Sequence, residues 1–224
     1  MIDNKSIVSL LSGLVSEKRL ERIEEILAQR TRYITVVLED IYQSQNASAV
    51  LRTCECFGIQ NVHIVENYNA YNINPMVLKG SDKWLNINRY NQSDNNSAEV
   101  VNRLRSEGYR IVATSLQEES TTLNNFDISR GKCAIVFGNE HQGVSKQILE
   151  QADEHLKISM FGFTQSLNIS VSAGIVISQL AQKMRNNVDW QLTSEEKKII
   201  RTEWLKCSVK NSQMLINRLE SESK

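Results

Sequence analysis

The chain has 224 residues, of which 41% are hydrophobic, 9 are glycine and 1 is proline. This composition suits the core of one medium-sized domain, and it excludes a disordered chain and a collagen-like or linker-like chain. Lysine and arginine together number 26, as do aspartate and glutamate, so the formal net charge is zero. A globally basic nucleic-acid-binding protein is thereby excluded, although a local basic patch is not.

In chain order, hydrophobic periodicity predicts a helix over 6–30, a strand over 33–38, a helix over 46–57 and a strand over 61–65. A short helix over 74–80, a strand over 84–90, a helix over 98–107 and a strand over 110–114 are expected next. The remaining predictions are a strand over 133–138, a helix over 144–152, a strand over 155–158, a helix over 167–184 and one or two helices over 193–220. This alternation indicates an α/β protein whose parallel sheet has helices on both faces. We expect the α/β domain to span 31–189, with helical extensions over 1–30 and 190–224.

Signals for a membrane, for export and for a metal are missing. The sequence has no apolar run of the roughly 18 residues that a membrane span needs, and residues 1–20 do not read as a signal peptide. Cys54 and Cys56 stand too close for an ordinary disulfide, and the three histidines form no ligand spacing with the four cysteines. We therefore expect a cytoplasmic protein with reduced cysteines, no metal and no membrane contact.

Several catalytic signatures are also missing. No G-x-G-x-x-G follows a strand, which disfavours a dinucleotide-binding oxidoreductase and an ordinary Rossmann methyltransferase. The run from Gly138 to Ser145 copies the glycine spacing of a P-loop, but no lysine follows Gly143, which disfavours an NTPase.

Polar residues cluster in three segments where a strand ends and a helix begins, the edge at which parallel α/β sheets bind ligands. In the first segment, Asn46 is expected to cap a helix on which Arg52 lies nearly two turns further along. In the second, Glu140 stands between Gly138 and Gly143, which allow close backbone approach to a ligand.

The third segment, 160–174, begins polar and continues into a helix of small residues. Ser166 or Asn168 is expected to cap this helix, and small side chains such as Ala173 permit close packing against another element. Taken singly, each segment also fits a plain structural role as a capped helix, a tight turn or a packed helix.

Together the three segments resemble the sequence motifs of the SPOUT superfamily of RNA methyltransferases, in its SpoU/TrmH branch. They read N-A-S-A-V-L-R-T-C-E, I-V-F-G-N-E-H-Q-G-V-S and F-T-Q-S-L-N-I-S-V-S-A, in the family's order. R-I-E-E-I-L at 22–27 and G-S-D-K-W at 80–84 are similar to the tRNA guanosine-18 2′-O-methyltransferases rather than to their ribosomal relatives. The resemblance covers about residues 18–190.

The resemblance implies a parallel α/β sheet whose C-terminal part is a deep trefoil knot, a rare exception to the rule that chains are unknotted. It implies a homodimer whose sites are completed across the interface. It also implies S-adenosylmethionine bound in the knot. The residues expected to bind this cofactor are Thr114, Leu116, Gly138, Asn139, Ile158, Gly162 and Leu167.

By motif position, the resemblance implies that Arg52 is the catalytic arginine. Because arginine is a poor base, we expect Arg52 to hold an RNA phosphate and to orient the ribose 2′-OH rather than to take its proton. The residues expected to shape the site and to orient Arg52 and the ribose are Asn46, Glu140, Ser166 and Asn168.

Basic side chains for the RNA are also expected from the resemblance. Arg22, Lys183 and Arg185 match basic positions of the tRNA enzymes, and Lys18 stands near Arg22. Such side chains would bind phosphates, but mixed charge on solvated helix faces explains them equally well. The chain departs from the family at 42–45, where Y-Q-S-Q replaces the basic-Pro-His run that often precedes the asparagine of the first motif.

The sequence thus predicts an S-adenosylmethionine-dependent RNA ribose 2′-O-methyltransferase that acts on guanosine 18 in the tRNA D-loop. Two alternatives stay open. One is the same chemistry on ribosomal RNA or at another tRNA position, and the other is a non-catalytic dimeric RNA-binding scaffold.

Overall fold

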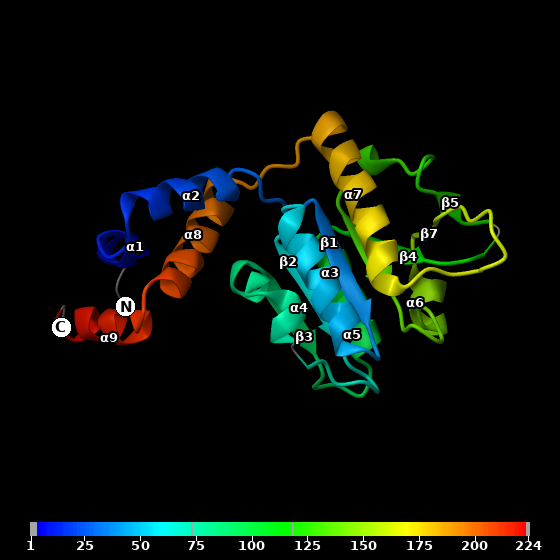
Figure 1. The fold of residues 1–224 in the computed structure, drawn as a ribbon, viewed down its shortest axis with the longest axis horizontal. Helices are drawn as coiled ribbons and strands as arrows, with labels where there is room; N and C mark the ends of the chain where they lie inside the picture. Colours follow the sequence, from blue (N-terminus) through cyan, green and yellow to red (C-terminus); the bar gives the residue numbers. More distant parts are fainter. Residues whose placement is uncertain (1–3, 73, 118, 223–224) are drawn as a thin grey trace. The chain divides into compact units, whose positions relative to one another are not determined.

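The computed structural model describes residues 4–72, 74–117 and 119–222. They form two compact units, one spanning 31–190 and the other built from both ends of the chain (Figure 1). The larger unit contains a seven-stranded sheet. Its strands are β1 (Ile34–Glu39), β2 (Asn61–Val65), β3 (Asn86–Tyr90), β4 (Arg110–Thr114), β5 (Thr121–Thr122), β6 (Cys133–Phe137) and β7 (Glu154–Lys157). Its helices are α3 (Ser44–Cys56), α4 (Pro75–Leu78), α5 (Asn96–Ser106), α6 (Lys146–Gln151) and α7 (Ile169–Asn187), with 3₁₀ turns η1 (Ser81–Trp84) and η2 (Ile128–Arg130).

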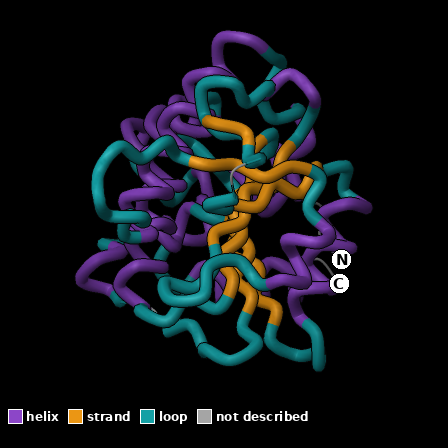
Figure 2. Tube along the Cα trace, turned by 90° about the vertical axis from the view of Figure 1, so that its right-hand side faces the viewer, coloured by secondary structure: helices purple, strands orange, loops and turns teal. Residues whose placement is uncertain are grey.

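The sheet has the order β3-β2-β1-β6-β4-β7-β5, and every pairing described in it is parallel. The chain runs outward from β1 to β3 and then returns with β4 on the far side of β6. The strand order therefore reverses beside β1, the position at which open α/β sheets bind ligands. Figure 2 shows the strands as a central layer with helices on either side. The predicted α/β class is confirmed.

Two apolar cores cover the two faces of the sheet. Because alternate side chains of a strand point to opposite faces, Val36 belongs to the core shared with α3 and α7, whereas Val37 belongs to the core shared with α5 and α6. Every residue of β1 is buried. This burial on both faces is why the central strands read as continuous apolar runs in the sequence.

Helix α7 brings the end of the larger unit back across the sheet. It follows β7, which lies beyond β4, yet it packs against α3 on the β1 side. Asn168 caps it, since the Asn168 Oδ1 accepts the N–H of Ser170 at 2.8 Å. The prediction of a cap at this position is confirmed for Asn168. The return of the chain places residues 158–168 near the carboxyl ends of the strands (Figure 1).

The smaller unit joins the two terminal segments, which the sequence alone presents as separate extensions. Its helices are α1 (Asn4–Ser12), α2 (Glu17–Leu27), α8 (Ser194–Ser208) and α9 (Ser212–Glu222). Arg201 of α8 forms an ion pair with Glu24 of α2 at 2.5 Å. The guanidinium of the buried Arg30 lies 5.1 Å from the ring centre of Trp204.

The prediction of a single helix over 6–30 is wrong. The structure has two helices here because the backbone of Ser16 is extended, with φ −68° and ψ 150°, and its Oγ accepts the N–H of Arg19 at 3.3 Å. Such an N-cap begins a new helix and ends continuity with the previous one. The short strand β5 was not predicted, since two threonines give no periodicity to detect.

All four cysteines fall within the described residues, and none forms a disulfide. Burial raises the pKa of the Cys133 thiol to about 12, so this side chain acts as a small hydrophobe. No helix in the described ranges has both the length and the apolar character needed to cross a bilayer. Within the same ranges, no group of three or more His, Cys, Asp or Glu side chains could hold a metal ion.

Candidate active site

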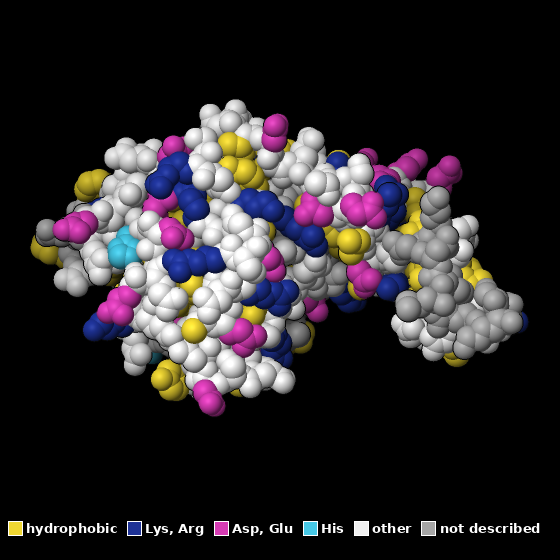
Figure 3. Space-filling view, turned by 180° about the vertical axis from the view of Figure 1, so that it is seen from behind, with side chains coloured by type: hydrophobic (Ala, Val, Ile, Leu, Met, Phe, Trp, Pro, Cys, Tyr) yellow, Lys and Arg dark blue, Asp and Glu magenta, His cyan; other side chains and the backbone are white. Residues whose placement is uncertain are grey.

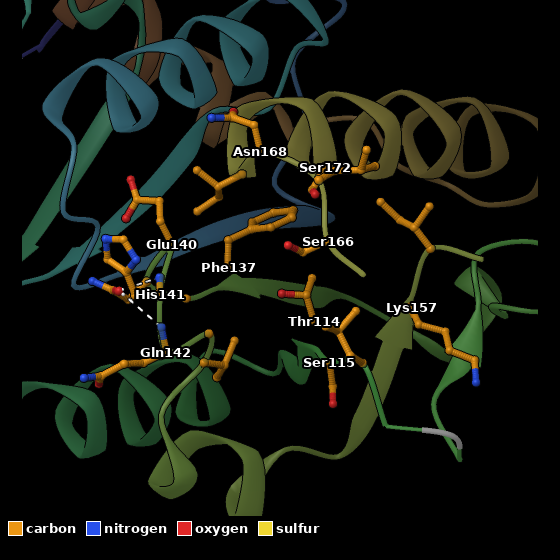
Figure 4. Close-up of a pocket in the computed structure, with 18 of the residues that line it drawn as sticks. Thr114, Ser115, Phe137, Glu140, His141, Gln142, Lys157, Ser166, Asn168 and Ser172 are labelled. Carbon is orange, nitrogen blue, oxygen red and sulfur yellow. Dashed lines mark hydrogen bonds between the residues drawn. The ribbon is translucent and has the colours of Figure 1, made fainter. Parts of the chain in front are cut away.

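A pocket of about 630 Å³ lies at the carboxyl ends of β4, β6 and β7 (Figure 4). This volume falls in the range of small-molecule sites, roughly 300–1,000 Å³. Its walls come from 114–116, 137–144, 156–158 with 160, and 165–169, together with residues of α3, α6 and α7. The second and third motifs of the sequence thus form most of the pocket.

A chain of hydrogen bonds links one residue from each of the three motifs at one end of the pocket. The Asn168 Nδ2 donates to the Asn46 Oδ1 at 3.2 Å, and the Asn46 Nδ2 donates to the Glu140 Oε1 at 2.8 Å. The carboxylate also accepts the backbone N–H groups of Tyr42 at 2.8 Å and Gln43 at 3.1 Å. Three segments that lie far apart in the sequence therefore fix one another's positions.

The role of Asn46 differs from the predicted one. Gln43 is the N-cap of α3 and makes no capping hydrogen bond with its side chain, while Asn46 lies inside the first turn. The prediction that Asn46 caps the helix is wrong, because its amide bonds to Glu140 and Asn168 instead. The Glu140 carboxylate stands at the start of α3, where negative charge interacts favourably with the helix dipole.

The surroundings of Glu140 favour its ionised form. Burial by itself would raise the pKa of this carboxyl. The hydrogen bonds from Asn46 and from the backbone N–H groups of Tyr42, Glu140 and Gln43 outweigh burial, and the pKa is lowered. Glu140 therefore acts as a fixed negative charge and hydrogen-bond acceptor at neutral pH.

The loop after β6 requires glycine at two positions. A Cβ on Gly138 would overlap the backbone of Gly143 and Val144, and Gly143 itself has a φ of +72°. Asn139 and Gly143 exchange backbone hydrogen bonds of 2.9 and 2.8 Å, which closes the loop tightly. The close packing lets residues 138–144 of this loop line the pocket.

Six of the seven residues predicted to bind the cofactor line the pocket. They are Thr114, Leu116, Gly138, Asn139, Ile158 and Leu167. Gly162 is not among the lining residues and stands exposed. The hydroxyl of Thr114 donates to the carbonyl of Val136 at 2.9 Å, so its hydroxyl hydrogen is already used within the sheet.

Four of the five residues predicted to be catalytic also line the pocket, namely Asn46, Glu140, Ser166 and Asn168. Arg52 does not. It is exposed on α3 and about 9 Å further along the helix axis than Asn46, at about 1.5 Å per residue. The structure of one chain thus brings together every predicted catalytic residue except the arginine.

The basic residues predicted to bind RNA fall in different environments. Lys18 and Arg22 are exposed on α2 of the smaller unit, where Arg22 pairs with Glu25 at 3.0 Å. In the larger unit, the Lys183 ammonium donates to the carbonyls of Leu123, Asn124 and Phe126 at 2.7, 2.7 and 3.2 Å. These three bonds use its three N–H donors.

Arg185 is half-buried, with its guanidinium 4.3 Å from the ring centre of Trp190. Elsewhere on the molecule, Lys and Arg side chains are interspersed with Asp and Glu, as Figure 3 shows for one face. This distribution agrees with the zero net charge of the chain.

Some pocket residues were not singled out by the sequence analysis. Gln43, His141, Gln142, Lys157 and Ser172 line the pocket but were given no role. The motifs themselves held a signal for two of them, because His141 and Gln142 directly follow Glu140 in the second motif. Lys157 gave none, since it ends a short strand, β7, in which only Leu156 is fully buried.

Comparisons with known proteins agree with this geometry. The profile of the SpoU rRNA methylase family matches residues 33–178. The tRNA (guanosine(18)-2′-O)-methyltransferase of Borreliella burgdorferi is 43% identical over 215 residues, 96% of either chain. The crystal structure of the Aquifex aeolicus TrmH/SpoU tRNA modifying enzyme superposes with a TM-score of 0.76 at 31% identity, covering 87% of this chain and 98% of that one.

A more distant structure shares the fold. The SpoU methyltransferase AviRb from Streptomyces viridochromogenes, in complex with AdoMet, gives a TM-score of 0.56 at 19% identity over 74% of this chain and 62% of that one. The family profile covers well over half of the described chain and includes all three motifs. The chain therefore belongs to the SpoU methylase family.

Proposed function

We propose that the protein transfers a methyl group from S-adenosylmethionine to the ribose 2′-OH of guanosine 18 in tRNA. The observation that carries this proposal is the hydrogen-bonded set Asn168–Asn46–Glu140, which joins the three family motifs at one end of the pocket. The activity of the Borreliella burgdorferi relative supports the choice of nucleotide, because the likeness extends over 96% of the chain.

The residues present in the pocket suit the proposed cofactor. The loop 138–140 lines the pocket with polar chain, and the apolar side chains of Leu116, Ile158 and Leu167 suit the faces of a nucleoside base. Glu140 supplies negative charge at the end of the pocket where the three motifs meet. When bound, S-adenosylmethionine supplies a methyl group activated by its sulfonium.

The chain's own contribution to the reaction is positioning. Glu140, Asn46 and Asn168 hold one another and the start of α3, which gives the ribose a rigid wall of amide and carboxylate groups. Alignment of the attacking oxygen with the methyl carbon supplies much of the rate in a displacement of this kind. Arg52 is exposed on the same helix but outside this pocket, so we assign it to the RNA phosphate beside the ribose in the partner's site of the homodimer proposed below.

We further propose that the C-terminal part of the larger unit is knotted and that the protein is a homodimer. The return of α7 from β7 to α3 supports the first proposal. Exposed apolar side chains beside the pocket support the second, and they are Leu116, Phe161, Phe163, Leu167 and Val171. A partner chain would cover such a surface, and a site completed across the interface would explain why Arg52 lies outside the pocket of its own chain.

For the RNA we propose contacts with Lys18 and Arg22, whose side chains are exposed, and with Arg185. Lys183 is proposed to act at the RNA surface mainly by holding the 123–126 segment in place. We place the protein in the cytoplasm, where its proposed substrate is found.

The function is tested by methyl transfer from S-adenosylmethionine to unmodified tRNA, with the product nucleotide mapped by mass spectrometry. Three substrates separate the alternatives: tRNA, tRNA with a 2′-deoxyribose at guanosine 18, and ribosomal RNA. We expect one 2′-O-methyl on the first substrate and none on the other two. A methyl group at another nucleotide or in ribosomal RNA would contradict the proposed target.

The variant Arg52→Ala serves as the matched inactive enzyme. It should bind S-adenosylmethionine with unchanged affinity in calorimetry and transfer no methyl group, because the phosphate that orients the ribose is no longer held. Wild-type turnover in this variant would contradict the role of Arg52. A wild-type protein that binds tRNA but not S-adenosylmethionine would instead be a scaffold.

A further inference from the structure

Two aromatic rings pair beside the pocket, one on a lining residue and one on the residue before Gln43, and neither ring takes part in the hydrogen-bonded set. Tyr42 precedes α3, and His141 follows Glu140 and lines the pocket (Figure 4). Their ring centres are 5.8 Å apart and their planes meet at 63°, an edge-to-face arrangement. The side chain of Tyr42 stays 63% exposed, and His141 is also exposed.

Both rings are carried by backbone that is fixed on two sides. The N–H of Tyr42 donates to the Glu140 Oε2 at 2.8 Å, and the N–H of His141 donates to the Asn139 Oδ1 at 2.9 Å. The two loops are also tied to each other, since the Asn139 Nδ2 donates to the carbonyl of Asp40 at 2.7 Å. The backbone that carries both rings is therefore held at the Glu140 loop before any ligand arrives.

Burial does not account for this pair, because exposed rings gain little from it. Exposed aromatic faces are what proteins use to stack unpaired RNA bases. Residues 42–45, Y-Q-S-Q, include no basic side chain that could bind the RNA through its charge instead of by stacking. A rigid ring with few rotatable bonds also loses little conformational entropy when it binds.

We propose that Tyr42, supported at its edge by His141, is the stacking platform for the base of the nucleotide that is methylated. The inference rests on the proposed function and deepens it by naming the residue that holds the base. Because the backbone N–H of Tyr42 is bonded to Glu140, we expect a base stacked on the Tyr42 ring to bring its own ribose to the Asn46–Glu140–Asn168 set.

The test compares Tyr42→Ala with Tyr42→Phe, which keeps the aromatic face and loses only the hydroxyl. Tyr68→Ala is the matched control, because Tyr68 is a 90% exposed tyrosine on the loop after β2 whose backbone N–H donates to Asp40 rather than to Glu140. The readouts are KM and kcat for tRNA and the Kd of S-adenosylmethionine. We expect a KM about tenfold higher in Tyr42→Ala, as for the loss of one stacked base, near-wild-type values in Tyr42→Phe and Tyr68→Ala, and no change in the Kd of the cofactor.

A second measurement reads stacking directly. tRNA carrying 2-aminopurine at the methylated position should lose fluorescence on binding wild-type protein or Tyr42→Phe, and keep it with Tyr42→Ala. The proposal is overturned if Tyr42→Ala keeps the wild-type KM and quenching, or if the alanine and phenylalanine variants are equally impaired. If the wild-type enzyme methylates a different RNA, the proposed substrate is wrong, and the same variants compared on that RNA still decide the role of Tyr42.

Discussion

At the residue scale, Glu140 connects Asn46 of the first motif, and the backbone just before that motif, to the second motif. Its two carboxylate oxygens accept three hydrogen bonds from Tyr42, Gln43 and Asn46. A residue able only to accept is needed, because all three partners are N–H donors. The requirement explains why an ionised carboxylate, with a lowered pKa, occupies this position.

Replacing Glu140 with glutamine should therefore lower both stability and activity. The new NH₂ group faces an N–H donor, so we expect a loss of about 1–3 kcal/mol in the free energy of unfolding and of about tenfold or more in kcat. Because the native pKa of Glu140 is lowered, its stabilising effect is present above the ordinary pKa of the carboxyl and is lost as the pH falls. The difference in the free energy of unfolding between wild type and Glu140→Gln should thus become smaller at acidic pH.

Urea unfolding near neutral pH and near pH 4 measures this difference, together with methyl-transfer assays. Glu150→Gln is the control, since Glu150 is an exposed glutamate on α6. Equal stability and turnover of wild type and Glu140→Gln would contradict the role assigned to the carboxylate.

His63 on β2 makes the stability of the fold sensitive to acid. Burial, and secondly the charge of Arg103, lower its pKa from 6.5 to about 4. Its Nδ1 lies 2.9 Å from the Tyr90 hydroxyl, while its Nε2 has no partner among the described residues. The unfolded chain takes up this proton at a higher pH than the folded chain, so stability is lost as the pH falls from 6.5 towards 4.

At about pH 4.5 this proton uptake should lower the free energy of unfolding by about 2–3 kcal/mol relative to neutral pH. His63→Asn keeps a partner for the Tyr90 hydroxyl and does not titrate. Between neutral pH and pH 4.5, its free energy of unfolding should therefore fall by about 2–3 kcal/mol less than that of the wild type. Urea unfolding of both proteins at the two pH values gives the comparison. The carboxylates that titrate in this range are common to both proteins, so their effect on stability cancels in the difference. Parallel losses would show that His63 is not responsible.

At the element scale, the turn between β6 and α6 determines the shape of the pocket. Asn139 and Gly143 close it through two backbone hydrogen bonds, and its following helix is capped by Ser145, whose Oγ accepts the N–H of Ile148 at 3.3 Å. The Ser145 N–H and hydroxyl also donate to the buried Glu39 at the end of β1. The loop that lines the pocket is thus anchored to the central strand.

Gly138→Ala should disrupt this turn. The added methyl group overlaps the backbone of Gly143 and Val144, which cannot move as a flexible side chain could. We expect a loss of about 3 kcal/mol in stability and weaker binding of S-adenosylmethionine. Thermal unfolding and calorimetry are the measurements. Gly13→Ala, whose methyl would meet carbonyl oxygens no nearer than 3.6 Å, should change neither, and a similar result for Gly138→Ala would contradict the close approach.

At the scale of the whole molecule, two units serve one proposed substrate. The larger unit carries the pocket, and the smaller unit carries Lys18 and Arg22 on the exposed side of α2. Because the chain has no net charge, long-range attraction to RNA is weak, and phosphate binding depends on such local groups.

The double variant Lys18→Ala/Arg22→Ala should therefore weaken tRNA binding without changing the Kd of S-adenosylmethionine. For each of the two side chains that binds one phosphate, its removal should reduce the slope of log affinity against log salt concentration by about 1. Arg103→Ala is the control, since Arg103 is exposed on α5 and pairs with Glu107 at 3.1 Å. An unchanged salt slope in the double variant would mean that α2 does not bind the RNA.

The sequence by itself determined the parallel α/β class, the position of most elements and the three motifs. The predicted strands 61–65 and 110–114 coincide with β2 and β4. These features are local, because a run of apolar β-branched residues favours a strand wherever it lies, and a cap is recognised from a few neighbouring residues.

Only the tertiary structure decided which groups satisfy one another. Asn46 and Glu140 are 94 positions apart, so no local pattern shows that the amide bonds to the carboxylate instead of capping its own helix. The same holds for Lys183, whose ammonium is taken up by carbonyls about 60 positions earlier in the chain, at Leu123 and Asn124. Hydrogen-bond partners of this kind depend on which distant segments the fold brings together, whereas helix and strand preferences depend on neighbouring residues along the chain.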